Sequence, residues 1–202
     1  MTSIRVHYFE SRGRAEVIRL ILHYNNVKFE DIRIPKDTWP EKKGNYKYGQ
    51  VPALEVDCKF LYQTNAIVRY LAKQYNLAGK DAWEQAKIDE LHELLQEFYK
   101  EIREYTMVLH GMASGDKDKL YAEKFIPAAK KYLPFFEQAL LEAGSGFYAK
   151  SGITYFDFVV FEAASRIAKD EPELAKEFPL FVKNGHKFHE IPELQDYLST
   201  RT

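Results

Sequence analysis

The chain has 202 residues, of which 46% are hydrophobic and 29% are charged, and its formal net charge is −1. This length predicts one or two domains with a sizeable core. The near-neutral balance and the lack of a basic block argue against a nucleic-acid binder. No apolar run approaches a membrane span, and charged residues interrupt the first residues before a secretory signal could form. A cytoplasmic protein with no nucleic-acid or membrane partner is expected.

The first 75 residues predict a small mixed α/β layer. Strands are expected over residues 4–8 and 27–34, and the segment between them has apolar residues at helical spacing. A strand, a helix and a strand in this order predict a parallel pair with a right-handed crossover. The remaining elements are a polar segment at 39–43, strands near 52–56 and 59–62, and a helix over about 64–75.

The turn between the last two strands contains Cys58, the only cysteine of the chain. A single cysteine excludes an intrachain disulfide and a cysteine cluster for zinc. Cys58 follows Asp57 in a two-residue turn, where positive φ normally calls for glycine. Either the turn is of another type or Cys58 is strained and exposed, and a plain turn residue is favoured over a redox role.

Two features of this region have open alternatives. Val51-Pro52 is ordinarily a trans bond at a strand start, with a cis bond expected in about one case in ten. A cis bond would turn the Val51 backbone outward like a sheet edge. Gln63-Thr64 opens an amphipathic helix, and Thr64 as a plain N-cap is favoured over free amides that hold an anion. A cis Val51-Pro52 bond and an anion-binding helix start at Gln63-Thr64 would together form a site suited to a small peptide with a free carboxylate.

Beyond residue 82 the pattern predicts only helices. A long helix carries apolar residues at steps of three or four from Ile88 to Tyr105. A second helical region covers about 119–142, where Pro127 and Pro134 should each bend or interrupt the hydrogen-bond ladder.

The last part of the chain has clear helix starts. Thr154 to Asp157 forms a capping box. Shorter helices are expected to begin near Pro172, Pro179 and Pro192, because proline is favourable in a first turn. The predicted organisation is an α/β domain over residues 1–77, a linker at 78–82 and an all-helical domain over 83–202. Architecture alone does not fix an activity.

Several segments resemble, in order and spacing, those of cytosolic glutathione transferases, with the sigma class as the closest match. That class includes many invertebrate enzymes and the haematopoietic type of prostaglandin D synthase. The resemblance implies a thioredoxin-like N-terminal domain with a cis-proline, followed by an all-helical domain. The matching segments are YFESRGRAEVIRL, WPEKK, YGQVPALEVD, LYQTNAIVRYL, LAGK and GITYFD.

The resemblance assigns the catalytic roles to Tyr8 and Arg14. Tyr8 matches the family's catalytic tyrosine, whose phenol can hold the glutathione thiolate by an O–H···S contact. Arg14 matches the arginine that supports this tyrosine, and its charge and the helix start should favour the anionic sulfur. Lowering a thiol pKa by two units from about 8.5 corresponds to about 2.7 kcal/mol. The thiolate itself is then the nucleophile.

The resemblance also implies a glutathione site built along the N-terminal domain. The backbone of Val51, beside cis-Pro52, would pair with the cysteinyl part of glutathione. Gln63 and Thr64 would bind the γ-glutamyl end at a helix N-terminus. Trp39 and Lys43 would bind the glycine carboxylate. The full predicted set is Tyr8, Trp39, Lys43, Gln50, Val51, Pro52, Gln63, Thr64 and Glu97, with Glu97 reaching the neighbouring subunit of a homodimer.

The implied function is conjugation of reduced glutathione to small hydrophobic electrophiles, as in detoxification. No metal and no cofactor other than glutathione as co-substrate is expected, in part because Gln96 interrupts an acidic cluster. One alternative is a non-catalytic structural or ligand-carrying protein. Another is a prostaglandin isomerase, which Glu104 in place of a family tryptophan makes doubtful. The predicted second-substrate pocket consists of Phe9, Gly13, Arg14, Tyr99, Tyr105 and Phe161.

Overall fold

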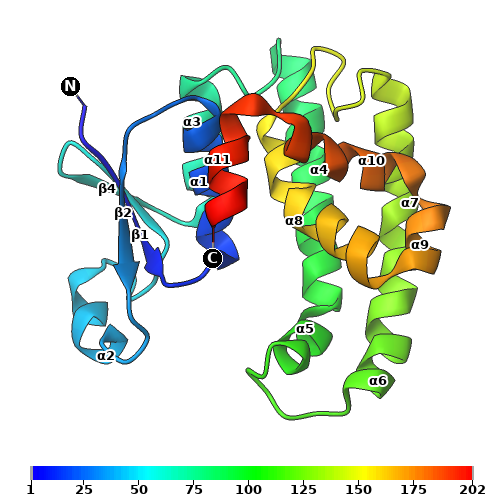
Figure 1. The fold of residues 1–202 in the computed structure, drawn as a ribbon, viewed down its shortest axis with the longest axis horizontal. Coiled ribbons are helices and arrows are strands. Elements are labelled where there is room, and N and C mark those ends of the chain that lie inside the picture. The colour runs from blue at the N-terminus through cyan, green and yellow to red at the C-terminus, as the bar shows by residue number, and fades with distance from the viewer. Residues whose placement is uncertain (1, 202) are drawn as a thin grey trace. The chain divides into compact units, whose positions relative to one another are not determined.

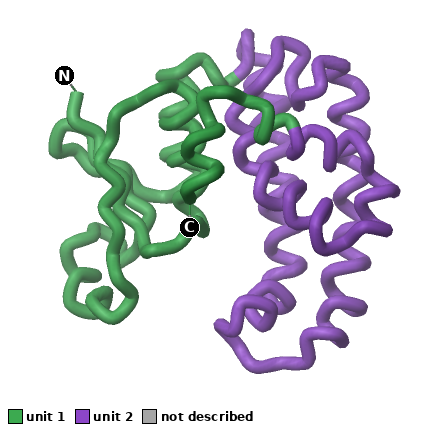
Figure 2. The backbone as a smooth tube through the Cα atoms, in the orientation of Figure 1, with its two compact units in different colours: residues 1–78, 187–202 green, residues 79–186 purple. Residues whose placement is uncertain are grey.

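A computed structural model describes residues 2–201 of the chain. The chain forms two compact units, residues 1–78 with 187–202 and residues 79–186 (Figure 2). We call them the sheet unit and the helical unit. The predicted division by chain order placed residues 187–202 with the helical domain, whereas by packing this segment belongs to the sheet unit.

The sheet unit contains a mixed sheet in the order β2-β1-β3-β4 (Figure 1). The first two strands are parallel, as the strand–helix–strand pattern predicts, and β3 runs antiparallel to both β1 and β4. The second strand is shorter than predicted, because the Val27 amide donates to the Leu22 carbonyl and closes the preceding helix. The strands are β1 Ile4–Phe9, β2 Glu30–Ile34, β3 Ala53–Val56 and β4 Lys59–Tyr62.

The hairpin between β3 and β4 has the two-residue turn that the sequence predicts. Asp57 and Cys58 both have positive φ, at 47° and 64°. This is the backbone that a two-residue hairpin requires, and it is adopted here without glycine. Cys58 is exposed at the turn.

The helices α1, α3 and α11 of the sheet unit lie on one side of the sheet (Figure 1). The helix α1 packs against both α3 and α11, and its buried face includes Ile18, Ile21 and Leu22. This apolar spacing is why the segment forms a helix that faces the sheet. The helical elements are η1 Gly13–Ala15, α1 Glu16–Tyr24, α2 Trp39–Lys42, η2 Lys43–Asn45, α3 Thr64–Gln74, η4 Phe188–Glu190 and α11 Pro192–Thr200.

The helical unit has no strand among the elements described for residues 79–186, apart from an isolated bridge between Ala149 and Gly152. Its α-helices are α4 Ala82–Glu101, α5 Arg103–Leu109, α6 Lys117–Leu120, α7 Ile126–Ala143, α8 Tyr155–Asp170, α9 Pro172–Glu177 and α10 Pro179–Lys187. A π-helical turn, Tyr121–Phe125, precedes α7.

The long helix is interrupted earlier than predicted. It ends at Glu101, and α5 begins at Arg103 after a break at Ile102. Ile102 is nevertheless buried, so the apolar spacing continues across a backbone break that side-chain periodicity does not detect.

Proline and capping signals define the other helices. Pro127 lies where the π-helical turn passes into α7, so the hydrogen-bond ladder changes there, as predicted. The helix continues through Pro134 to Ala143. The capping box at Thr154 is confirmed, with the Thr154 amide 2.8 Å from Asp157 Oδ2. The helix starts at Pro172, Pro179 and Pro192 are confirmed as well.

No helix within residues 2–201 is both long and apolar enough to cross a membrane.

Candidate active site

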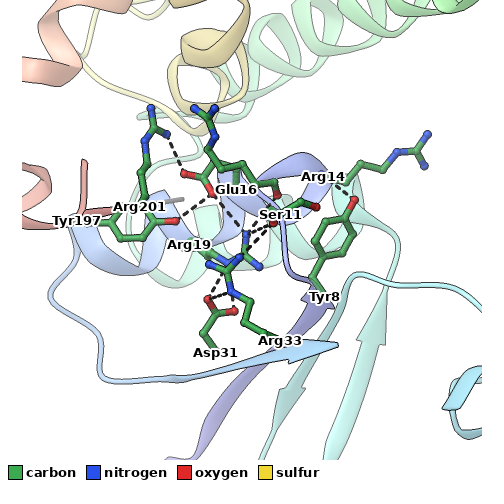
Figure 3. A network of polar contacts seen from close by, with 10 residues as sticks. Tyr8, Ser11, Arg14, Glu16, Arg19, Asp31, Arg33, Tyr197 and Arg201 are labelled. Carbon is green, nitrogen blue, oxygen red and sulfur yellow. Dashed lines mark hydrogen bonds and ion pairs between the residues drawn. The ribbon is translucent and has the colours of Figure 1, made fainter. Parts of the chain in front are cut away.

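Tyr8 lies at the end of a central strand of the sheet. It is next to last in β1 and only 8% of its surface is exposed. The chain turns after Phe9, where the Ser11 amide donates to the Phe9 carbonyl at 2.7 Å. The turn returns toward Tyr8, and the Arg14 backbone N–H donates to the Tyr8 hydroxyl oxygen at 3.1 Å (Figure 3). The Arg14 guanidinium points away from the phenol and is exposed (Figure 3).

Gly13 makes this close approach possible. Its φ is +43°, and a Cβ at this position would lie 2.7 Å from the Tyr8 hydroxyl oxygen and 2.9 Å from a ring carbon. Any side chain would therefore collide with the buried phenol. The start of the helical segment at residues 13–16 is thus held directly against Tyr8, with the Arg14 amide toward the hydroxyl.

A shallow, solvent-open hollow lies beside this turn. The hollow brings together predicted glutathione residues from separate parts of the sequence. The Val51–Pro52 bond on one wall is cis, as the family resemblance implies. Its lining residues are Arg14, Tyr48, Gln50, Val51, Pro52, Tyr62, Gln63 and Thr64.

The wall formed by Gln63 and Thr64 has an unusual backbone. Gln63 has φ of +70°, which a residue with a side chain rarely adopts and which occurs most often at functional sites. The helix α3 begins at Thr64, so Gln63 is the N-cap residue and the predicted N-cap role of Thr64 is wrong by one position. The Gln63 side chain makes no capping hydrogen bond with this helix start, and amides at a helix start are suited to bind an anion.

Trp39 and Lys43 lie on the short helical segment that follows β2. The Trp39 ring packs edge-on against Phe9, with ring centroids 5.1 Å apart, next to the end of β1. Lys43 is exposed, and its side chain lies against Gly49, where an added Cβ would be 2.9 Å from Lys43 Cε. Lys43 therefore lies beside the segment that leads into the hollow.

The other predicted site residues belong to the helical unit. Glu97 is exposed on α4, and the Tyr132 hydroxyl lies 3.5 Å from one of its oxygens. Tyr105 is buried against the rings of Tyr121 and Phe125. Loss of hydration raises the pKa of Tyr99 to about 12, so this phenol stays neutral at physiological pH. Phe161 has no exposed surface.

Sequence reasoning missed two sets of residues. Tyr62 lines the hollow, and its place directly before Gln63 could have identified it. Glu16 and Arg19 are charged yet fully buried in α1, below the turn that carries Arg14. Their opposite charges at a spacing of three residues were the available signal.

The described residues contain no group of three or more histidine, cysteine, aspartate or glutamate side chains placed to hold a metal ion. The prediction that no metal takes part in the reaction rests on the family resemblance.

Comparison with known proteins agrees with this geometry. The N-terminal domain of glutathione S-transferases matches residues 4–73, and the C-terminal domain matches residues 100–201. The chain is 39% identical to a probable glutathione S-transferase 7 of Caenorhabditis elegans, over 100% of this chain and 98% of that protein.

Solved structures give the same result. One is Na-GST-3 of the hookworm Necator americanus, described as monomeric, with a TM-score of 0.94, 37% identity and coverage of 99% and 98% of the two chains. Another is a Nu-class enzyme of Haemonchus contortus, with a TM-score of 0.90, 35% identity and coverage of 100% and 98%. The chain therefore belongs to the glutathione S-transferase family and is a transferase that uses glutathione.

Proposed function

We propose that Tyr8 donates a hydrogen bond to the sulfur of glutathione and holds it as a thiolate, which then attacks a small hydrophobic electrophile. The supporting observation is the contact from the Arg14 N–H to the Tyr8 oxygen at 3.1 Å. Because the oxygen accepts this bond, the phenol hydrogen is directed elsewhere, and it has no acceptor among the described residues. A phenol with an unused hydrogen is a suitable donor to a sulfur anion.

The thiolate gains further support from the start of the helical segment at Gly13. Its free amides carry partial positive charge, which stabilises an anion beside them. No nucleophile of the protein is needed, because the glutathione sulfur forms the new bond to the electrophile as the leaving group departs. The protein supplies binding, orientation and stabilisation of the anion.

The hollow has the features needed for the rest of glutathione, a tripeptide with carboxylates at both ends. The backbone of Val51 would pair with its central residue, and the uncapped start of α3 at Thr64 would hold the γ-glutamyl carboxylate. Trp39 and Lys43 would bind the glycine carboxylate. On the sheet unit, Phe9, Gly13 and Arg14 stay the predicted lining of the second-substrate pocket.

A titration of bound glutathione tests the role of Tyr8. Tyr8→Phe should raise the pKa of the bound thiol by about two units, with little change in glutathione affinity. Ultraviolet absorbance of the thiolate measures this pKa. If glutathione bound to Tyr8→Phe gives the same thiol titration curve as glutathione bound to the parent chain, Tyr8 does not have the proposed role. If the parent chain does not bind immobilised glutathione, the whole site is rejected.

Gly13→Ala offers a second test, because the new methyl group would displace the Tyr8 hydroxyl. We expect kcat/KM to fall about 100-fold, which corresponds to about 2.7 kcal/mol. Gly144→Ala is the matched control, since Gly144 also has positive φ, at +69°, but no atom lies within 4 Å of an added Cβ. Both variants strain the backbone, but only the Gly13→Ala methyl group collides with Tyr8, so equal kcat/KM values in the two variants would contradict the proposal.

A homodimer of the cytoplasmic, sigma-like type is also proposed. An aromatic cluster of Tyr48, Phe60 and Tyr62 lies on the sheet unit, with Tyr48 54% and Phe60 45% exposed. Exposed aromatic clusters of this kind favour an interface. Sedimentation should show a dimer that Tyr48→Ala with Phe60→Ala dissociates. A monomeric parent chain would reject the dimer and leave the Tyr8 chemistry unaffected.

A further inference from the structure

A buried network of charged side chains lies next to the turn at residues 11–14, outside the glutathione site. Glu16 is 1% exposed and Arg19 is fully buried. One carboxylate oxygen of Glu16 accepts from Arg201 Nη1 at 2.8 Å. The other accepts from the Tyr197 hydroxyl at 3.0 Å and lies 3.5 Å from Arg19 Nη1. The last helix, α11, and the residue after it thus close over the start of α1 (Figure 3).

Arg19 connects this network to the turn after β1. Its Nη1 donates to the carbonyl oxygens of Ser11 at 3.0 Å and Arg12 at 3.2 Å. Its Nε is held by the Asp31 carboxylate at 3.0 Å, and Arg33 also donates to the Ser11 carbonyl at 3.3 Å. The guanidinium is therefore fixed on several sides and holds the backbone of residues 11–12 in place.

The backbone held by Arg19 directly precedes the residues that contact Tyr8. Gly13 has no side chain with which to anchor the turn, so neighbouring contacts must fix its position. The next residue, Arg14, provides the N–H that binds the Tyr8 hydroxyl. The Arg19 guanidinium carbon also lies 5.9 Å from the centre of the Tyr8 ring. A continuous series of contacts thus joins Arg201 to Tyr8 (Figure 3).

We propose that Tyr197 and Arg201 are positioning residues, which act through Glu16 and Arg19 to keep the Arg14 N–H aligned on the Tyr8 hydroxyl. The inference rests on the proposed role of Tyr8. Without the contacts from Tyr197 and Arg201, the Glu16 carboxylate would keep only its long contact of 3.5 Å with Arg19 Nη1. A less firmly held Glu16 would in turn hold Arg19 less firmly. A small movement of the turn would then misdirect the phenol hydrogen, and misplacement of about 1 Å is enough to cost much of a catalytic effect.

Conservative variants of α11 test the proposal. Tyr197→Phe removes one hydroxyl and keeps the ring stacked on His23, where the centroids are 4.0 Å apart. Arg201→Met removes the charge and keeps most of the length. Each should raise the pKa of bound glutathione by about half a unit and lower kcat/KM about fivefold, with KM for glutathione nearly unchanged.

The controls separate positioning from stability. Ser199→Ala removes a hydroxyl on the same helix that bonds only to the Asp196 carbonyl, at 2.9 Å, and should behave as the parent chain. Arg201→Lys should restore part of the activity lost in Arg201→Met. If Tyr197→Phe and Arg201→Met lower the melting temperature but leave the thiol titration and kcat/KM at parental values, the network is only structural and the proposal is rejected.

A double-variant cycle with Tyr8→Phe locates the effect. If the network acts through Tyr8, adding Tyr197→Phe to Tyr8→Phe should change nothing further. An equal loss in both backgrounds would overturn the proposal, because the effect would bypass Tyr8. Failure of the proposed function is distinguishable, since Tyr8→Phe alone would then titrate as the parent chain does.

Discussion

The most deeply buried carboxylates of the two units, Glu16 and Asp157, are satisfied in different ways. In the sheet unit, Glu16 is paired with the cations Arg19 and Arg201. In the helical unit, Asp157 accepts hydrogen bonds from neutral donors: the amides of Tyr148 and Thr154, the Thr154 hydroxyl and the Asn184 side-chain amide. A charge pair can join distant segments, whereas neutral donors fix a local helix start and leave the acid sensitive to pH.

The use of neutral donors in place of cations affects the pKa of Asp157. Burial raises the pKa of Asp157 to about 6, and its hydrogen bonds with Thr154, Asn184 and Tyr148 oppose this rise. An acid without a cation in a buried site binds its proton more tightly than it does in the unfolded chain.

Removing the acid of the helical unit should have the largest effect. Asp157→Ala leaves buried donors of Tyr148, Thr154 and Asn184 without an acceptor, and we expect a loss of about 3–5 kcal/mol of unfolding free energy. Chemical denaturation measures it. Asp81→Ala is the control, because Asp81 caps α4 at an exposed position by accepting from the Glu84 amide, and should cost only about 1 kcal/mol. Equal losses would show that burial is not the cause.

The pH dependence of Asp157 comes next. Its folded pKa of about 6 exceeds the ordinary value of 3.8, so the folded state holds the proton more tightly. The stabilisation is complete below about pH 4 and is lost as pH rises through 6, with an amplitude of about 3 kcal/mol. The difference in unfolding free energy between the parent and Asp157→Asn should follow this curve. A difference that stays flat from pH 4 to 7 would contradict it.

Neutralising the acid of the sheet unit should cost less. Glu16→Gln keeps the shape and weakens the bonds to Arg201 and Arg19, and we expect a loss of about 2 kcal/mol. Arg19 keeps Asp31 as a counter-ion, which limits the loss. Glu190→Gln, at an exposed site in the same unit, should change stability by less than about 0.5 kcal/mol. A Glu16→Gln effect as small as that of the control would mean that the charge is unnecessary.

An exposed ion pair should have the smallest effect. Lys176 and Glu173 are 2.6 Å apart, but their side chains are 71% and 83% exposed. Lys176→Ala should therefore cost no more than about 0.5 kcal/mol, and added salt should abolish the difference. A larger loss would weaken the argument that burial makes the Glu16 pairs important.

Local sequence signals predicted much of the fold. The capping box at Thr154, the hairpin at Asp57 and the helix starts at prolines each depend on residues close together in the chain. The break at Ile102 was not predicted, since its buried side chain keeps the apolar period intact.

The family resemblance identified residues that line the hollow, but the buried network could not be found in this way. Tyr197 and Arg201 are separated from Glu16 by 181 and 185 residues. In sequence, Glu16 and Arg19 resemble an ordinary solvated pair on a helix. Only the packing of α11 on α1 shows that they are buried.

The composition of the sheet unit also bears on synthesis at the ribosome. Residues 1–78 emerge first, yet this unit needs residues 187–202 for completion. The whole helical unit, residues 79–186, is translated in between and can fold first. During that interval the Glu16 carboxylate lacks Tyr197 and Arg201. The surroundings of Glu16 are therefore complete only after Tyr197 and Arg201, more than 180 residues further along the chain, have been synthesised.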